Sequence, residues 1–271
     1  MNQRTPGSYY RALLMLVLCA GATRGQNILL QYKFTPGSLD RYKESSQTLM
    51  SSAMIPGGHQ TFTNESYTSQ KTESINSDGI GTILRVIDST SSTMNGQPFE
   101  NPAAQGALGF PLRVRVASTG KVLAVESLKD SLDQAARAML EAFRSQLVSQ
   151  PAFPPGPVRF NDSWQDSSEV SQQTQMGTLT TSIRYSTTLA GSDTVSGKPV
   201  WVLRTHIRLV GSIEGGAGTV DGNGDGFVYF SGVLGKEIRS SLEINQTMNV
   251  NSPQGAVSMT MKTTTTRELL R

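Results

Sequence analysis

The sequence predicts a mainly β protein whose strands form an antiparallel sheet, duplicated into an open barrel or a clam-like sheet with one central amphipathic helix. Three observations predict this class. Several segments alternate apolar and polar residues, as strands with one buried face do. Charged residues make up 17% of the 271 residues and Ser and Thr about a fifth, which favours strands over surface helices. A single segment has the spacing of an amphipathic helix.

The alternation is clearest in four segments, namely residues 27–34, 111–127, 200–210 and 256–266. In the second, Ser118-Thr119-Gly120 makes a turn between two strands. In the third, the residues that share one face are Trp201, Leu203, Thr205, Ile207 and Leu209. In the fourth, Val257, Met259 and Met261 lie opposite Ser258, Thr260 and Lys262. We expect every strand in these segments to have one buried side. Met and aromatic side chains, including Met259, Met261, Phe227 and Tyr229, are expected to point inward.

Residues 127–150 predict the central helix. Its apolar residues at helical spacing are Leu128, Leu132, Ala135, Met139, Phe143 and Leu147. Ser127 followed by Asp130 resembles a capping box, and the proline-rich linker of residues 151–157 ends the helix because proline cannot continue it. We expect the apolar stripe to cover the sheet.

The helix and the linker separate two halves that resemble each other in the order of their motifs. Residues 36–49, 61–75, 81–92 and 115–127 correspond in order to residues 160–173, 178–191, 200–212 and 230–242. The last pair shares a Gly-Lys dipeptide, at Gly120 and Gly235. We therefore predict a signal peptide (1–25), a first β half (26–126), the central helix (127–150), the linker (151–157) and a second β half (158–271).

The N-terminus has the pattern of an export signal. Arg4 and Arg11 precede an apolar run, residues 12–22, and cleavage after either Ala22 or Gly25 fits the small residues there. The run is shorter than the 18 or more residues of a spanning helix, so we predict no membrane-spanning segment in the mature chain. The protein is expected to be exported, and to be periplasmic or secreted.

Cys19 is the only cysteine, and it lies inside this signal. Lipid attachment to its thiol is disfavoured, because Leu18 stands where lipoprotein signals have a small residue. Removal of residues 1–25 takes away three arginines and no acid, so the formal charge falls from +3 to about zero. A neutral mature chain without a Lys/Arg cluster gives no basis for a nucleic-acid partner.

The stretch DGNGDG begins at Asp221 and has the first spacing of a calcium loop. Asp221, Asn223 and Asp225 could supply side-chain oxygens, but Gly232 occupies the twelfth position, where a bidentate Glu belongs. Asn-Gly and Asp-Gly are also common hairpin turns. We therefore interpret the stretch as a hairpin connection, with calcium as the weaker alternative and no other cofactor expected.

Catalytic motifs are absent from the sequence. His59 and His206 are the only histidines, which excludes a multi-histidine metal site, and His206 lies between two arginines on the polar face of its strand. There is no G-x-S-x-G elbow and no phosphate loop. Trp164 and Trp201 are interpreted as core residues. We expect a protein that is not an enzyme.

The motif Pro157-Val158-x-x-Asn161-Asp162-Ser163-Trp164, followed by antiparallel strands and a Gly-Lys turn, resembles an uncharacterised family of secreted bacterial β-rich proteins. Asn161 stands where that family is expected to have Gly. The resemblance implies no activity. More distantly, strands with a covering helix are similar to the half-barrels of periplasmic lipoprotein carriers.

Two functions fit these observations. In the first, the concave face of the sheet binds or carries a lipid or other apolar small molecule in the cell envelope. In the second, the protein is an envelope or extracellular structural or interaction module with a filled core, whose partner is another envelope protein. A cavity between helix and sheet would favour the first function.

Overall fold

The computed structural model describes residues 27–100, 102–129, 150–174, 177–252 and 255–270, together with Arg137, Leu140, Glu141, Arg144, Ser145 and Leu147. The strands are β1 (Leu39–Ser52), β2 (His59–Ile75), β3 (Gly81–Met94), β4 (Gln97–Pro98), β5 (Leu112–Val116), β6 (Val122–Ser127), β7 (Ser163–Thr174), β8 (Gly177–Val195), β9 (Lys198–Ile213), β10 (Gly218–Ser231), β11 (Lys236–Ser252) and β12 (Gly255–Leu269). Two short helices connect strands, α1 (Pro102–Ala107) and the 3₁₀ helix η1 (Glu214–Gly216). The prediction of a mainly β, antiparallel fold is confirmed.

The strands form one sheet with the order β6-β5-β3-β2-β1-β12-β11-β10-β9-β8-β7, and β4 pairs with β3 outside this path. Most strands pair with the strands next to them in the chain, and in addition β1 pairs antiparallel with β12. The two edge strands, β6 and β7, are consecutive in the chain. The sheet is therefore a meander whose first and last strands have joined, left open between β6 and β7.

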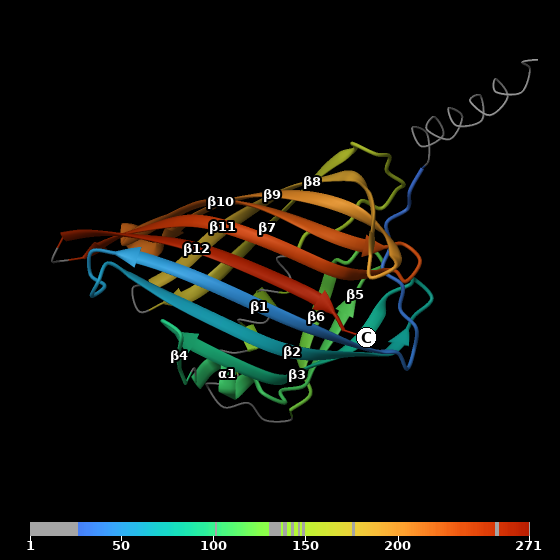
Figure 1. Cartoon of the computed structure of the whole chain (residues 1–271), viewed down its shortest axis with the longest axis horizontal. Helices are drawn as coiled ribbons and strands as arrows, with labels where there is room; N and C mark the ends of the chain where they lie inside the picture. The colour runs from blue at the N-terminus through green and yellow to red at the C-terminus, as the bar shows by residue number, and fades with distance from the viewer. Residues whose placement is uncertain are drawn as a thin grey trace, which may run out of the picture.

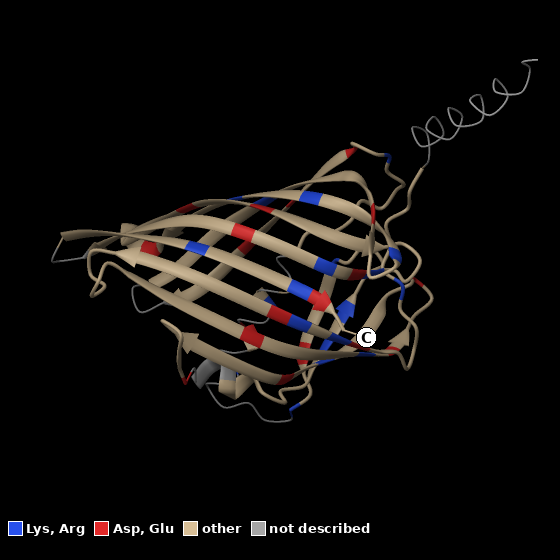
Figure 2. Cartoon of the chain, in the orientation of Figure 1, with Lys and Arg blue, Asp and Glu red and all other residues tan. Residues whose placement is uncertain are grey.

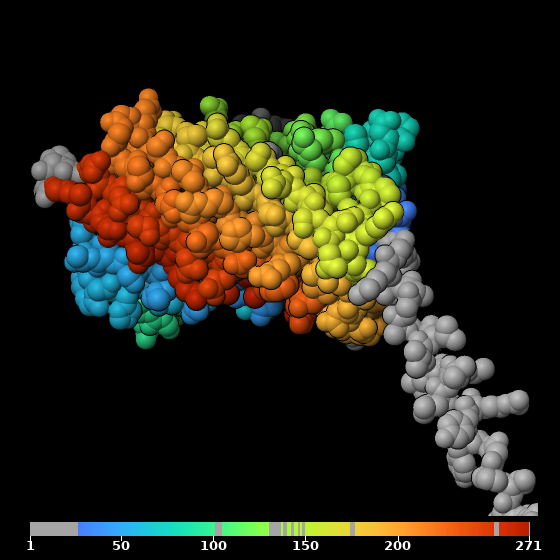
Figure 3. Space-filling model, turned by 90° about the horizontal axis from the view of Figure 1, so that it is seen from above, coloured from blue at the N-terminus to red at the C-terminus, as the bar shows by residue number. Residues whose placement is uncertain are grey.

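The sheet curls strongly, so that β5, β6 and β7 pass behind β1, β2 and β12 in Figure 1. Seen from above in Figure 3, strands β8 to β12 form one continuous outer surface. Alternate residues of each strand consequently face either the inside of the curve or the outside. The register shows which residues of a strand face inward, because inward residues of paired strands lie opposite each other. Examples are Met50 with Met261 and Glu44 with Arg267.

The N-terminal segment crosses one end of the curled sheet. Residues 27–34 are not a sheet strand as predicted, since only Ile28 forms an isolated bridge, with Val158. The alternation of burial is nevertheless as predicted, because Ile28 and Leu30 are buried and Leu29 is exposed. The buried residues of this end are Ile28, Leu30, Val158, Leu189, Leu203 and Phe230, with Trp164 and Trp201 packed against them. The prediction that both tryptophans belong to the core is confirmed.

The predicted central helix falls largely on residues outside the described ones. The described residues of this segment, Arg137, Leu140, Glu141, Arg144, Ser145 and Leu147, are helical. Leu140 and Leu147 are buried against the inward residues of β5 and β6, which are Leu112, Val114 and Val125. Ser127 belongs to β6, and its side chain accepts a hydrogen bond from the backbone N–H of Lys129. The described part of the segment thus covers the sheet beside its open edge.

The strand order bears on the two similar halves. Each pair of corresponding segments falls on strands of the same rank: β1 with β7, β2 with β8, β3 with β9, and the β5–β6 hairpin with the β10–β11 hairpin. Strand β12 has no counterpart in the first half, and it is the strand that joins the halves. The duplication itself stays a prediction.

Candidate functional site

The calcium candidates Asp221, Asn223 and Asp225 lie in the middle of strand β10. The interpretation of DGNGDG as a hairpin connection is therefore wrong. All six residues pair with β9 on one side and β11 on the other, and the three polar side chains point outward while the glycines between them are buried. Local turn propensity was overridden by pairing with two neighbouring strands.

The buried glycines of β10 are explained by how closely β11 approaches them. A Cβ at Gly222, Gly224 or Gly226 would lie 2.8 Å, 2.5 Å or 2.7 Å from its nearest neighbour on β11, a side-chain carbon at Gly222 and a backbone carbonyl oxygen at the other two. A glycine in a strand interior marks such close approach, and glycines also let a sheet bend sharply. This row of glycines therefore permits the curvature that makes the sheet concave.

The outward acids of β10 lie close to side chains of β9. Asp221 forms an ion pair with Arg208, and Asp225 Oδ1 lies 3.3 Å from His206 Nδ1. The Cα atoms of Asp221 and Asp225 are about 13 Å apart, at a rise of about 3.3 Å per residue, whereas calcium ligands lie about 2.3–2.6 Å from the ion. The three predicted ligands cannot therefore share one calcium ion. Among the described residues, no three His, Cys, Asp or Glu are grouped as metal ligands would be.

Apolar side chains line the inside of the curve on strands β8 to β12. We call the following residues the concave apolar face: Ile183, Tyr185, Ile207, Leu209, Leu242, Ile244, Met248, Met259 and Met261. Tyr185, Ile207 and Leu209 are buried, and Ile183, Leu242 and Ile244 pack on them while keeping part of their surface exposed. The inward orientation predicted for Met259 and Met261 is confirmed, but Phe227 and Tyr229 point outward.

The opposite wall, on strands β1 to β3, is polar. Its inward residues include Ser46, Thr48, Asn64, Ser66, Thr90 and Ser92, which face one another across the strand pairs. Several are joined by hydrogen bonds, as Thr90 and Ser92 both donate to Asn64 Oδ1. The inside of the sheet thus has an apolar wall and a polar wall.

A network of charged side chains lies at the end of the sheet where β1 meets β12. Both Arg85 on β3 and Arg267 on β12 lie 3.2 Å from Glu44 Oε1, and Arg267 is also 3.5 Å from Glu237. Arg267 stacks over the ring of Tyr42, 3.8 Å from its centroid. We call these five residues the buried charge network. On the inside of the sheet, the network links β1 and β3 to β11 and β12.

Burial perturbs the ionisation of this network. Desolvation lowers the pKa of Arg85, and the nearby charge of Glu44 opposes this only in part. Desolvation acts in the same direction on Arg267, but Glu237 and its other neighbours outweigh it and raise the pKa of Arg267 above its ordinary value. Burial raises the pKa of Tyr42 to about 12, so its phenol is protonated at neutral pH. For Arg85, unlike Arg267, nearby negative charge does not make up for the loss of hydration.

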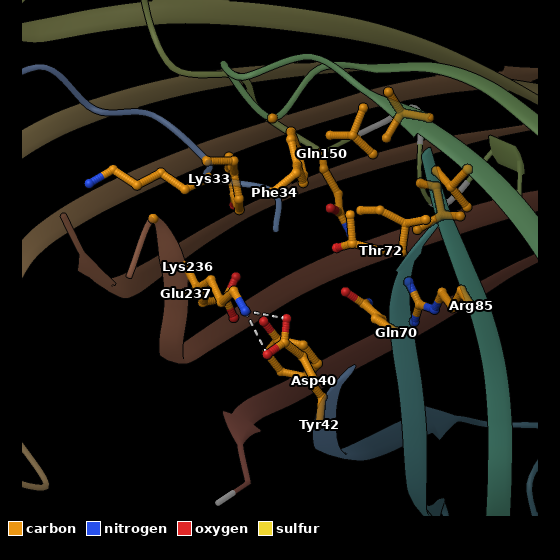
Figure 4. Close-up of a pocket in the computed structure, with 18 of the residues that line it drawn as sticks. Lys33, Phe34, Asp40, Tyr42, Gln70, Thr72, Arg85, Gln150, Lys236 and Glu237 are labelled. Carbon is orange, nitrogen blue, oxygen red and sulfur yellow. Dashed lines mark hydrogen bonds and ion pairs between the residues drawn. The ribbon is translucent and has the colours of Figure 1, made fainter. Parts of the chain in front are cut away.

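A cavity of about 90 Å³ lies beside the network, lined by residues of the N-terminal segment, β1, β2, β3, β5, β11 and β12. In Figure 4, Arg85 and Gln70 lie on one side of it, and the ion pair of Lys236 with Asp40 lies on the other. Drug-sized ligands occupy about 300–1,000 Å³, so this cavity is too small for a lipid. It suits water or a small polar group.

A wider depression of about 870 Å³ is lined by the N-terminal segment, by residues of β8 and β9, and by Gly232 and Val233. Its apolar lining includes Leu29, Trp201 and Val233, and Val233 is 70% exposed. Lys, Arg, Asp and Glu residues are scattered along the strands, as Figure 2 shows. Many of these charges form pairs between neighbouring strands, such as Lys43 with Glu65 and Lys262 with Glu243.

The residues 157–164 form the turn that leads into β7. Asn161 has a φ of 70°, a left-handed conformation that glycine adopts most readily, which accounts for the Gly expected there. Asp162 accepts a hydrogen bond from the backbone N–H of Arg159, and the Trp164 indole donates to the carbonyl of Ala152. The motif therefore has a structural role in this chain.

Comparisons with known proteins bear on the fold alone. No family model and no curated protein matches the chain. Among solved structures the chain is similar to lipovitellin, from a study of its lipid–protein interactions, with a TM-score of 0.47, 11% identity and 88% of this chain covered. It spans about a quarter of that protein, 26%. Salmonella typhi OmpF in complex with daunomycin matches with a TM-score of 0.27, 6% identity, and 86% and 98% of the two chains covered. DynF from the dynemicin pathway of Micromonospora chersina has a TM-score of 0.24, 6% identity, and 89% and 84% covered. At TM-scores below 0.5, these likenesses carry no argument about function.

The sequence analysis missed the buried charge network, although one signal for it is present. The alternation that places Met259 and Met261 inward continues through Thr263 and Thr265 to Arg267, which therefore faces inward too. A charged residue at an inward-facing position of a strand needs a partner inside the protein. That partner, Glu44, is more than 200 positions away and could not be identified without the β1–β12 pairing.

Proposed function

We propose that the protein is an exported, non-catalytic carrier that binds a lipid or other apolar small molecule against the concave apolar face. The observation that carries this proposal is the partial exposure of inward apolar side chains on β11 and β12. Leu242, Ile244, Met248, Met259 and Met261 point into the curve but are not fully covered. Covering apolar surface is worth about 25 cal/mol for each Å², so such a face favours an apolar occupant.

The chemistry of this face fits a ligand without a single rigid shape. Met248, Met259 and Met261 are flexible and polarisable, and methionine adapts to irregular or variable partners. The branched side chains of Ile244 and Leu242 add a firmer surface beside them. No helix among the described residues is long and apolar enough to cross a membrane.

The test is ligand binding by a pair of matched variants. Ile244→Ser removes apolar surface from the concave apolar face, and Val210→Ser removes it from the outer face of β9, where Val210 is 51% exposed. We expect Ile244→Ser to lower the affinity for an apolar fluorescent probe by about tenfold, which corresponds to the loss of about 1.4 kcal/mol from apolar burial. Val210→Ser should leave the affinity unchanged.

Native mass spectrometry of the protein purified from its own host supplies the second readout. Copurified lipid that excess detergent displaces supports the proposal. A bare mass, together with equal probe affinity for Ile244→Ser and Val210→Ser, contradicts it. If Val233→Ser weakens probe binding and Ile244→Ser does not, the ligand binds in the depression that Val233 lines.

One observation favours the alternative, an envelope or extracellular interaction module. Strand β7 pairs with β8 along one side, and within the described part of the chain no strand pairs with its other side. An open edge of this kind can accept a strand from a partner. A bare mass combined with a stable complex that a Pro substitution at Ser167 in β7 abolishes would favour this function.

A further inference from the structure

Arg85 on β3 carries a buried donor that has no acceptor. Its Nη2 donates a hydrogen bond to Glu44 Oε1 at 3.2 Å, while its Nε is buried without a hydrogen-bond partner among the described residues. The hydroxyl of Thr68, an inward residue of the adjacent strand β2, is in the same situation. A buried polar group without a partner costs about 1–3 kcal/mol, so such groups mark places where water or a ligand binds.

The orphaned donor lies beside the cavity of about 90 Å³. Arg85 lines this cavity together with Gln70, which lies opposite it in the β2–β3 register, and with Tyr42. Figure 4 shows the Arg85 and Gln70 side chains projecting from the same wall. The space accommodates a carboxylate but not a hydrocarbon chain, and a carboxylate matches the planar fork of a guanidinium group.

The ion pairs around the cavity leave Arg85 with little anionic partnership. Lys236 is paired with Asp40, Arg267 lies near both Glu44 and Glu237, and Lys33 donates to the carbonyls of Gly232 and Val233 at an exposed position. Among the described residues, Arg85 forms an ion pair only with Glu44, which it shares with Arg267. The lowered pKa of Arg85 is consistent with this, because its surroundings stabilise the charged form less than water does.

The residues beside the cavity lead, along the register of β12 and β11, to the concave apolar face. Arg85 and Arg267 contact the same oxygen of Glu44, and Arg267 lies opposite Ser240 on β11. The next inward residue of β11 is Leu242, about 7 Å further along at a rise of about 3.3 Å per residue, and Ile244 follows it. A ligand with its head group at Arg85 would pass Glu44 and Arg267 before its hydrocarbon chain reaches these apolar side chains.

We propose that Arg85 anchors the carboxylate of a long-chain monocarboxylic acid whose hydrocarbon chain lies along the concave apolar face. This inference rests on the proposed function and specifies its ligand class. The guanidinium Nε and Nη groups donate to the carboxylate, which supplies the acceptor that Nε lacks. The protonated phenol of Tyr42, on the same wall, is available as a further donor.

The experiment compares two ligands that differ only in the head group. Isothermal titration of the purified protein with hexadecanoate and with hexadecan-1-ol measures what the charge contributes. We expect the acid to bind at least tenfold more tightly than the alcohol, and we expect Arg85→Gln to abolish this preference while keeping the affinity for the alcohol. The control is Arg113→Gln, on the outward face of β5 and paired with Glu73, which should keep the preference.

The outcomes separate this inference from the proposed function. If the wild type binds acid and alcohol equally, or if Arg85→Gln keeps the preference, the anchor is wrong and the carrier stands. If neither ligand binds, the carrier itself is contradicted. Should Arg85→Gln fail to fold, carbon-13 NMR of carboxyl-labelled hexadecanoate on the wild type decides, because a cationic anchor lowers the pKa of the bound acid, whereas binding wholly on the concave apolar face leaves that pKa unchanged or raises it.

Discussion

The curvature of the sheet depends on glycines of β10, and one substitution tests this directly. In Gly224→Ala the new Cβ would lie 2.5 Å from the carbonyl oxygen of Glu243 and 2.9 Å from Ile244 Cγ1. Ordinary contacts of a Cβ are 3.4–4 Å, so β11 has to move by several tenths of an ångström or more. Overpacking of this kind costs about 1–3 kcal/mol, and the backbone contact places the expected loss in the upper part of that range.

A matched variant gives the baseline. Gly191→Ala in β8 adds the same methyl group at a glycine with nothing within 4 Å, so it should change stability little, or raise it by about 0.4–1 kcal/mol through the lower entropy of the unfolded chain. Urea denaturation followed by circular dichroism measures both variants, with equal m-values required for the comparison. Equal midpoints for Gly224→Ala and Gly191→Ala would refute the proposed role of the glycines.

Two further predictions concern charges. Arg267→Met leaves Glu44 with Arg85 alone and removes the cation beside Glu237, and both acids are only partly exposed. We expect it to lower the unfolding free energy by about 1–3 kcal/mol in urea denaturation; a smaller loss would mean that water reaches these acids. The exposed pair of Lys43 and Glu65 lowers the pKa of Glu65, so its contribution exists above the unfolded-state pKa and disappears as pH falls through the folded-state pKa. The midpoint difference between wild type and Glu65→Gln should therefore be present at pH 7 and absent at pH 3, and a difference that persists at pH 3 would assign it to packing.

The calcium hypothesis and the glycine row illustrate where prediction from the sequence fails. DGNGDG has strong local turn propensity, and nothing within the six residues indicates that β9 and β11 flank it. Asp221 and Asp225 alternate with glycines at the period of a strand, which predicts a strand. The Asp-Gly and Asn-Gly dipeptides of the same stretch predict a turn. Tertiary pairing satisfied every backbone group of the stretch as a strand, which a turn could not do.

The position of Phe227 and Tyr229 shows a second limit. Both belong to a strand with clear alternation, but their parity is that of Asp221 and Asp225, which face outward. The side of a strand that faces inward follows from its neighbours, and the assignment of β10 required the register with β11.

The sequence by itself determined the strands and the alternation of their faces, because the side-chain period of two is a property of a few consecutive residues. It determined that Trp201, Leu203, Met259 and Met261 would be inward. The tertiary structure decided that β1 joins β12, that the sheet stays open between β6 and β7, and that Arg85 and Arg267 meet at Glu44. These depend on contacts between residues more than 200 positions apart, such as Glu44 with Arg267, which no local pattern encodes.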